Sequence, residues 1–222
     1  MSVGLALGSA SSITFSPSPR LVEEHIQRAR ALRPCQRREH AGFDFVSRFW
    51  IHHASIEFAP LEDSSFAEPL RDFHHNRGPG VGQAIAAYVD SRRARFSRCA
   101  FRGRQDTLFL GPLPPRPRVP GSFVGPGESG PRILKAHRFE DCLVEGDVDF
   151  IFGSAAALFL RCEIRSLRLP PGRKGYVTAS SSPEGAALGL CFLDCGLSGD
   201  AEPGSVFLGR PWRPHAQAAF LY

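Results

Sequence analysis

The sequence is poor in lysine and lacks long apolar runs. Lys135 and Lys174 are the only lysines among 27 basic residues in a chain of 222. No apolar run approaches the roughly 18 residues that a membrane-spanning helix needs, so we expect no membrane partner. Residues 1–10 are mildly apolar, but the run is short and no basic residue precedes it. It is a weak signal-peptide candidate at best.

Paired metal-binding motifs are also absent. None of the 6 cysteines belongs to a CxxC pair and none of the 8 histidines to an HExxH motif, so we expect no metal and no other cofactor. The formal net charge of +5 permits a polyanionic partner. No block of basic residues carries interleaved aromatics, so we do not expect nucleic acid binding.

A glycine-rich run at residues 78–82 raises a nucleotide-binding domain as one alternative. Its spacing is not G-x-G-x-x-G, because Gln83 and Ala84 follow the run. A nucleotide-binding domain would place a helix over residues 83–96, whereas the β-prone Tyr88-Val89 indicates a strand. Circular dichroism rich in helix would favour this alternative.

The length and the 42% hydrophobic content predict one domain with a core of its own. Residues 1–45 carry the weakest secondary-structure pattern in the chain. Ser18 can cap a helix, Pro19 suits its first turn and Pro34 ends it, so we expect a short N-terminal helix there. The main domain is expected over residues 46–222.

A short pattern of the form apolar-x-x-small-x-apolar returns along the chain at intervals of 20 to 45 residues. A constant strand-sized unit with irregular spacing is typical of stacked coils whose loops vary in length, as in a parallel β-helix. Cysteine, a small hydrophobe, suits the interior of such a stack. A β-sandwich remains the alternative. The repeats are Ile51–Ile56, Phe96–Phe101, Phe139–Val144, Phe159–Ile164 and Phe192–Leu197.

Two segments interrupt this pattern. Residues 59–82 are charged and then glycine-rich, and residues 111–132 carry seven prolines and several glycines. Proline and glycine at such density do not form the interior of a strand ladder. We expect both segments to be long surface loops, which are often functional.

Polar side chains stand inside or beside several β-prone runs. Asp149 alternates with Val148, Phe150 and Phe152, although aspartate is disfavoured in strands. It is either exposed on the polar face of a half-buried strand or a catalytic carboxylate held on a rigid element. Further polar sites beside β-prone runs are Gln83, Gln105, Asp106 and Arg210. In a solenoid, residues this far apart in sequence can line one groove.

Four motifs that carry these residues occur in the order and approximate spacing of the pectinesterases, a family of carbohydrate esterases. They are Gln83-Ala84, Gln105–Phe109, Gly146–Gly153 and Leu208–Trp212. The chain resembles this family over about residues 50–222, and most of all its bacterial branch. The resemblance implies an all-β fold, a right-handed single-stranded parallel β-helix of the pectin lyase type.

The resemblance also implies roles. Asp149 is expected to attack the methyl-ester carbonyl of a galacturonate unit, and Arg210 to orient it and keep it ionised. Asp106 is expected to protonate the departing methanol and then to activate water. The remaining expected site residues are the oxyanion donors Gln83 and Gln105 and the groove aromatics Phe109, Phe152 and Trp212.

The expected substrate and partner is pectin, and the expected protein is a secreted or cell-wall monomer. The family continues with further coils beyond the point that corresponds to Tyr222, so we expect the β-helix to be incomplete at its C-terminal end. The chief rival is a catalytically inactive β-helix that binds polysaccharide, or a truncated paralogue. Binding to pectin without release of methanol would favour the rival.

Overall fold

The computed structural model describes residues 79–80, 82–123 and 127–222, together with four strands at residues 47–51, 54–58, 64–66 and 72–74. The chain divides into two compact units, residues 1–37 and residues 38–222. The helix expected between Ser18 and Pro34 lies outside the described residues. The part of the chain that the structure describes contains no helix able to span a membrane.

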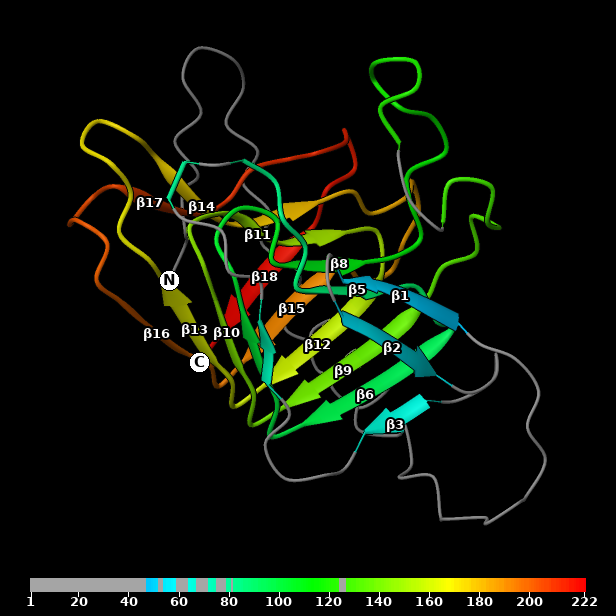
Figure 1. Ribbon diagram of the computed structural model, residues 1–222, viewed down its shortest axis with the longest axis horizontal. Helices are drawn as coiled ribbons and strands as arrows, with labels where there is room; N and C mark the ends of the chain where they lie inside the picture. The colour runs from blue at the N-terminus through cyan, green and yellow to red at the C-terminus, as the bar shows by residue number, and fades with distance from the viewer. Residues whose placement is uncertain are drawn as a thin grey trace. The chain divides into compact units, whose positions relative to one another are not determined.

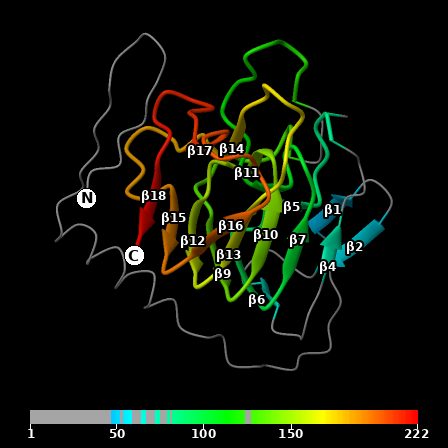
Figure 2. The same ribbon diagram turned by 90° about the vertical axis from the view of Figure 1, so that its left-hand side faces the viewer.

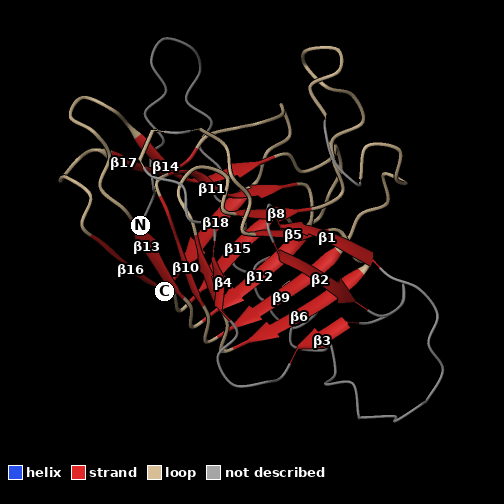
Figure 3. Cartoon of the chain, in the orientation of Figure 1, coloured by secondary structure: helices blue, strands red, loops and turns tan. Residues whose placement is uncertain are grey.

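The second unit is built from strands and loops in its described residues (Figures 1 and 3). Apart from the strands at residues 47–51 and 54–58, the described strands belong to three sheets, which we number in the order in which each coil visits them. Sheet 1 consists of β5 (Ala87–Val89), β8 (Leu108–Leu110), β11 (Val148–Gly153), β14 (Gly175–Ser180) and β17 (Val206–Gly209). Sheet 2 consists of β3 (Ser64–Phe66), β6 (Arg93–Ser97), β9 (Ala136–Glu140), β12 (Ala156–Leu160), β15 (Leu190–Leu193) and β18 (Ala218–Leu221). Sheet 3 consists of β4 (Asp72–His74), β7 (Ala100–Arg102), β10 (Leu143–Gly146), β13 (Glu163–Ser166) and β16 (Gly196–Gly199).

All neighbouring strands within these three sheets pair in parallel. The chain passes from sheet 1 to sheet 2 to sheet 3 and then begins the next coil beside the last (Figure 2). This is the parallel β-helix predicted from the repeats. A β-sandwich is excluded, because its hairpins would make the pairs antiparallel. The helix that a nucleotide-binding domain would need over residues 83–96 is also absent, since β5 and β6 occupy this stretch.

Two predictions at the start of the β-helix were wrong. The first repeat, Ile51–Ile56, does not form a coil, because β1 (Ser47–Ile51) and β2 (Ala54–Phe58) pair antiparallel as a two-stranded sheet. Strands separated by so few residues can pair only antiparallel, since a parallel pair needs a crossover of a dozen residues or more. Residues 59–82 are not one long loop either. The three-residue strands β3 and β4 lie in this segment and pair with β6 and β7, and strands this short leave almost no periodic signal in the sequence.

Stacked phenylalanines fill the interior of the coils along sheet 2. The rings of Phe96, Phe139, Phe159, Phe192 and Phe220 follow one another with centroid distances of 5.0, 4.6, 4.6 and 4.3 Å and nearly parallel planes. The first four are at most 1% exposed. Each ring contacts the equivalent ring of the next coil, so the ladder stabilises the register of the strands as well as the core.

The corner between sheets 2 and 3 explains why the repeat has its particular form. One residue there turns the chain in the left-handed region of φ and ψ, and a buried cysteine follows it inside the corner. The turning residues have φ between 50 and 54° and are Arg98, Asp141, Arg161 and Asp194. The cysteines after them are Cys99, Cys142, Cys162 and Cys195, all free. The small residue of the repeat is therefore small because it fills the inside of a tight corner.

We expect Phe159→Ala to lower the free energy of unfolding by about 3–5 kcal/mol, because it leaves a cavity between two stacked rings. Leu197→Ala on β16 is the control, since Leu197 is 44% exposed. Its expected cost is below about 1 kcal/mol. Chemical denaturation of both variants measures the two values. Equal losses would contradict the assignment of the ladder as the main core.

Candidate active site

The predicted site residues lie along sheet 1 on neighbouring coils, from Gln83 and Gln105 ahead of its first strands to Arg210 directly after β17. Gln83 and Gln105 form an isolated parallel bridge just ahead of β5 and β8. The backbone amide of Asp106 donates to the carbonyl of Val148 over 3.0 Å, which places the two aspartates of the site on adjacent coils. The β-helix thus brings together residues that are 66 positions apart in the sequence, from Gln83 to Asp149.

Asp149 owes its position to a β-bulge. Val148 pairs with Tyr176 and Ile151 with Thr178, so β11 has two residues where β14 has one. Phe150 and Ile151 are both buried in the core, and Asp149 turns outward with φ of 51°. The simple alternation predicted for this strand is therefore wrong. Aspartate tolerates the left-handed region better than most residues, which suits it to a bulge.

The residues before the bulge make room for it. A Cβ atom on Gly146 would lie 2.2 Å from the Cβ of Phe150, so only glycine lets this phenylalanine turn inward. Asp147 is 2% exposed and its carboxylate lies 3.4 Å from the guanidinium of Arg104. Burial is the main cause that raises the pKa of Asp147. Its pairing with Arg104 gives Asp147 a structural role at the corner rather than a place among the exposed polar groups.

Arg210 reaches back over one coil to hold Asp149. Its Nε and Nη2 atoms donate to the two carboxylate oxygens of Asp149 over 2.8 and 2.5 Å. Its guanidinium lies 4.4 Å above the ring of Tyr176 on the intervening strand β14. The hydrogen bond to Asp149 is the main cause that raises the pKa of Arg210. A bidentate pair of this kind fixes the direction of the carboxylate as well as its distance.

Asp106 has a different environment. It is 6% exposed, and its backbone also lies in the left-handed region, with φ of 62°. Burial, followed by the negative charge of Asp149, raises its pKa to about 7, while Arg210 and the side chain of Gln83 oppose the rise. Asp106 therefore carries a proton at mildly acidic pH. A protonated carboxyl beside a bound carboxylate is the arrangement that acid–base chemistry needs.

The two glutamines stand beside Asp106 at the edge of the site. Gln83 is exposed and Gln105 is half-buried. The amide of Ala84 donates to the carbonyl of Gln105 over 3.0 Å, which fixes the two backbones side by side. Side-chain amides can donate hydrogen bonds to an oxyanion that develops near Asp106 and Asp149.

An aromatic row runs along sheet 1 beside the carboxylates. Ring centroids are 4.3 Å apart for Tyr88 and Phe109, 5.2 Å for Phe109 and Phe152, and 5.8 Å for Phe152 and Trp212. Phe109 is 1% exposed and Phe152 is 8% exposed, whereas Trp212 is half-buried. Of the three aromatics predicted to contact sugar rings, Trp212 is thus the most accessible. Phe109 lies beneath the surface and supports its neighbours.

Two contributors to the site were not foreseen. Tyr176 lies under Arg210, and Phe123 of the proline-rich loop packs edge-on against Trp212 at 6.4 Å. Tyrosine is common in β-strands, both in cores and on surfaces, so nothing in the run Gly175–Ser180 marks Tyr176 as a site residue. Phe123 lies in a segment rich in proline and glycine and has no periodic partner in the sequence. Residues 111–132 otherwise form the predicted loop in their described part.

No group of three or more histidine, cysteine, aspartate or glutamate side chains suited to a metal occurs in the described residues. The arrangement offers a clamped carboxylate, a second carboxyl with a raised pKa, two amide donors and a partly exposed tryptophan. These groups suit nucleophilic attack on an ester followed by proton transfer.

Comparisons with known proteins agree with the fold and the motifs. The Pectinesterase family model matches residues 134–222, which include Asp149 and Arg210. Pectinesterase 31 of Arabidopsis thaliana is 32% identical over 163 residues, which cover 73% of this chain and 43% of that protein. Probable pectinesterase 8 of the same plant is 34% identical over 145 residues, which cover 63% of this chain and 30% of that protein. The chain belongs to the pectinesterase family.

A solved structure shares the fold. The pectin methylesterase from carrot superposes with a TM-score of 0.52 and 22% sequence identity, over 72% of this chain and 51% of that chain. The present chain spans less than half the length of the curated relatives above.

The raised pKa of Asp106 makes stability depend on pH. Below the usual pKa of 3.8 its carboxyl is protonated in the folded and the unfolded chain. Between that value and about 7 the folded state keeps a proton that the unfolded state releases, so its contribution to stability falls as pH rises. Above about 7 the full cost, up to about 4 kcal/mol, is present.

We therefore expect Asp106→Asn to raise Tm at pH 8 by about 5 °C or more and to change it little at pH 3.5. Asp194→Asn, at an exposed corner position with a similar φ of 52°, controls for the exchange itself. Thermal unfolding followed by circular dichroism at both pH values measures the effect. The assignment fails if Asp106→Asn shifts Tm by the same amount at pH 3.5 and pH 8.

Proposed function

We propose that the protein is a pectin methylesterase, which hydrolyses methyl esters of galacturonate units in pectin to methanol and free carboxylates. The observation that carries this proposal is the contrast between two neighbouring aspartates. Asp149 is held by a bidentate pair with Arg210, while the pKa of Asp106 is raised to about 7 by burial and by Asp149. Carboxyl groups whose environments differ in this way can divide the roles of nucleophile and acid between them.

In the first step a carboxylate oxygen of Asp149 attacks the carbonyl carbon of the methyl ester. The carbonyl oxygen takes up the negative charge, and Gln83 and Gln105 are assigned as its hydrogen-bond donors. The bond to the methoxy oxygen then breaks as Asp106 transfers its proton to that oxygen. Methanol leaves, and the galacturonoyl group remains bonded to Asp149 as an anhydride.

In the second step Asp106, now ionised, removes a proton from a water molecule as the water oxygen attacks the galacturonoyl carbonyl. The bond to Asp149 breaks, so the product carboxylic acid is released and the Asp149 carboxylate is restored. Asp106 has regained its proton. Arg210 acts throughout as a positioning residue, because both its hydrogen bonds hold Asp149 in the direction of attack. No step needs a metal.

Substrate binding is assigned to the aromatic row. Trp212 packs against Phe152, which in turn packs against Phe109, and we assign its ring to contact with a sugar. The net charge of +5 suits an anionic polymer. Since methyl-esterified galacturonan is a component of cell walls, we propose that the protein acts outside the cell, as a monomer.

We expect purified wild-type protein to release methanol from methyl-esterified pectin and Asp149→Asn to lose about 10³-fold or more of kcat/KM. Gln105→Ala should lose about 10²-fold, since it removes one oxyanion donor. Asp194→Asn again serves as the control for an aspartate exchange away from the site. If folded wild-type protein binds pectin but releases no methanol, the rival hypothesis of an inactive polysaccharide-binding β-helix replaces this one.

The pH dependence of the reaction follows from the state of Asp106. Its carboxyl must be protonated to release methanol, so kcat/KM should fall about tenfold per pH unit above about 7. Steady-state methanol release between pH 5 and 9, with protein shown to remain folded throughout, measures this profile. A kcat/KM that stays constant up to pH 9 would remove Asp106 from the role of acid.

A further inference from the structure

The outer face of sheet 1 carries a second apolar cluster, separate from the core inside the coils. Along β5, Ala87 and Val89 belong to the inner core, whereas Tyr88 between them belongs to this outer cluster and is also buried. Alternate residues of a strand point to opposite faces, so an outward side chain is buried only when another segment covers it. The outer cluster consists of Tyr88, Phe109, Leu113, Phe123, Phe152 and Ala179, with Ile85 and Trp212 packed against it.

The proline-rich loop, residues 111–132, covers the outer cluster. Its first arm contributes Leu113 and Phe123, which are both buried. Most of the loop residues between them, from 115 to 122, are exposed. Two apolar side chains of an otherwise exposed segment are thus inserted among the aromatic rings of sheet 1, and the burial of their apolar surface stabilises the docked loop.

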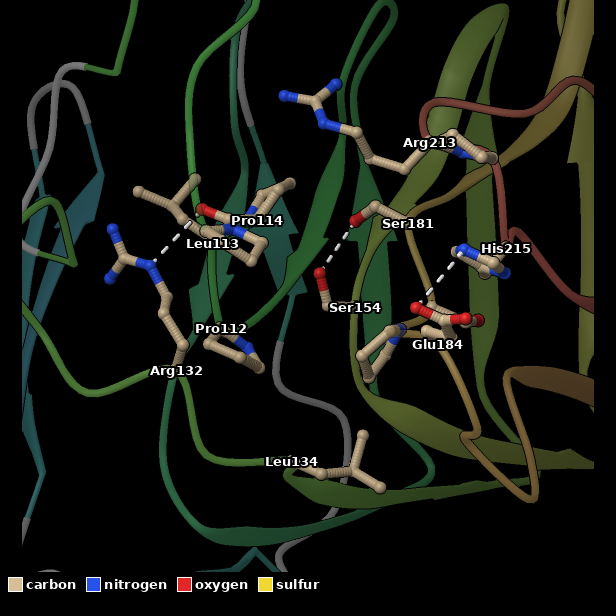
Figure 4. A pocket seen from close by; sticks show the side chains of 14 residues that line it. Pro112, Leu113, Pro114, Arg132, Leu134, Ser154, Ser181, Glu184, Arg213 and His215 are labelled. Carbon is tan, nitrogen blue, oxygen red and sulfur yellow. Dashed lines mark hydrogen bonds and ion pairs between the residues drawn. The ribbon is translucent and has the colours of Figure 1, made fainter.

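Hydrogen bonds hold the two arms of the loop together. Arg132 on the second arm donates to the carbonyl of Pro114 on the first arm over 3.2 Å (Figure 4). It also donates to three carbonyls within residues 127–130, over 2.8, 2.5 and 2.6 Å. A Cβ atom on Gly127 would lie 2.3 Å from the hydroxyl oxygen of Tyr88, so the second arm lies directly against the outer cluster. The loop is therefore fixed before any ligand binds.

Trp212 lies outside the strand ladders, after the end of β17. Its backbone amide donates to the carbonyl of Ser180 over 2.9 Å, and its side chain is half-buried. The centre of its indole ring lies 5.8 Å from that of Phe152, with an interplanar angle of 64°, and 6.4 Å from that of Phe123, with an angle of 70°. Aromatic pairs prefer such edge-to-face arrangements. One phenylalanine from sheet 1 and one from the loop therefore orient the indole ring.

The loop and the segment that follows Trp212 are not packed together over their full length. The pocket in Figure 4, about 290 Å³ in volume, lies between residues 112–115 on the loop and residues 213–215. Packing between the two segments is therefore incomplete, and the orientation of the indole ring depends on a few individual contacts. The contact with Phe123 thus matters more for this orientation than it would in a fully packed interface.

We propose that Phe123 is a positioning residue: through it, the docked proline-rich loop holds the ring of Trp212 in the orientation in which a sugar binds. The inference rests on the proposed function, in which Trp212 contacts a sugar. A ring that also samples other orientations binds more weakly, in proportion to the fraction of time that it spends in the competent one. Because Phe123 acts through a binding residue, it affects KM and leaves kcat unchanged.

Methanol release from methyl-esterified pectin tests the kinetic consequence. Leucine at position 123 keeps apolar bulk in the outer cluster, so the loop stays docked, but it lacks the aromatic edge. We expect Phe123→Leu to raise KM about fivefold with kcat unchanged. Val119→Ala is the matched control on the same loop, because Val119 is 64% exposed, and it should leave both constants unchanged. An unchanged KM in Phe123→Leu, or a fall in kcat in place of the rise in KM, would overturn the proposal.

Nitrogen-15 relaxation of the indole N–H groups measures the mobility of the ring without any reaction. The chain has two tryptophans, Trp50 and Trp212, and Trp212→Phe identifies their signals. We expect the order parameter of the Trp212 indole to fall from about 0.85 in wild type to below about 0.6 in Phe123→Leu, and to stay unchanged in Val119→Ala. Equal order parameters in wild type and Phe123→Leu would overturn the positioning role, even where methanol is released. Folded wild type that releases no methanol would overturn the proposed function, whatever the order parameters show.

Discussion

The ion pair between Asp149 and Arg210 depends on the register of three coils. The partners are 61 residues apart in the sequence and are joined across β14, where Tyr176 supports the guanidinium. Parallel pairing of β11, β14 and β17 sets this geometry, and the stacked phenylalanines inside the coils hold the strands in register. A shift of the strand register by one residue would turn outward-facing side chains to the core. The ion pair between Asp149 and Arg210 and the packing of the core therefore depend on the same register.

Positive φ values outside the repeated corners distinguish the two candidate catalytic aspartates from the scaffold. The described non-glycine residues with positive φ are six. Four of them repeat at the corner between sheets 2 and 3, each ahead of a cysteine, and are part of the architecture. The other two are Asp106 and Asp149, which share no such repeat. Left-handed backbone outside a regular turn is costly and gathers at functional sites, which supports the roles proposed for the two aspartates.

The sequence predicted the β-helix from a pattern that recurs along the chain, and the grouping of the polar residues from four motifs that occur in a known order. The repeat marks a corner residue and a cysteine that the structure uses in every full coil, and the motifs around Asp149 and Arg210 are distinctive. The sequence could not predict the bulge at Asp149, since Val148, Phe150 and Phe152 alternate as in a regular strand. It also could not reveal Tyr176, because the role of this tyrosine comes from its contact with Arg210, which lies on another coil.

The proposed chemistry requires Asp106 to be a protonated acid, which follows from its burial beside the charge of Asp149. Carbon-13 NMR of the aspartate carboxyl groups tests this directly, with Asp106 identified by its absence in Asp106→Asn. We expect Asp106 to titrate near 7 in wild type and at a lower pH in Asp149→Asn, where the neighbouring charge is gone. A midpoint near the usual value of 3.8 in wild type, or one unchanged by Asp149→Asn, would contradict it.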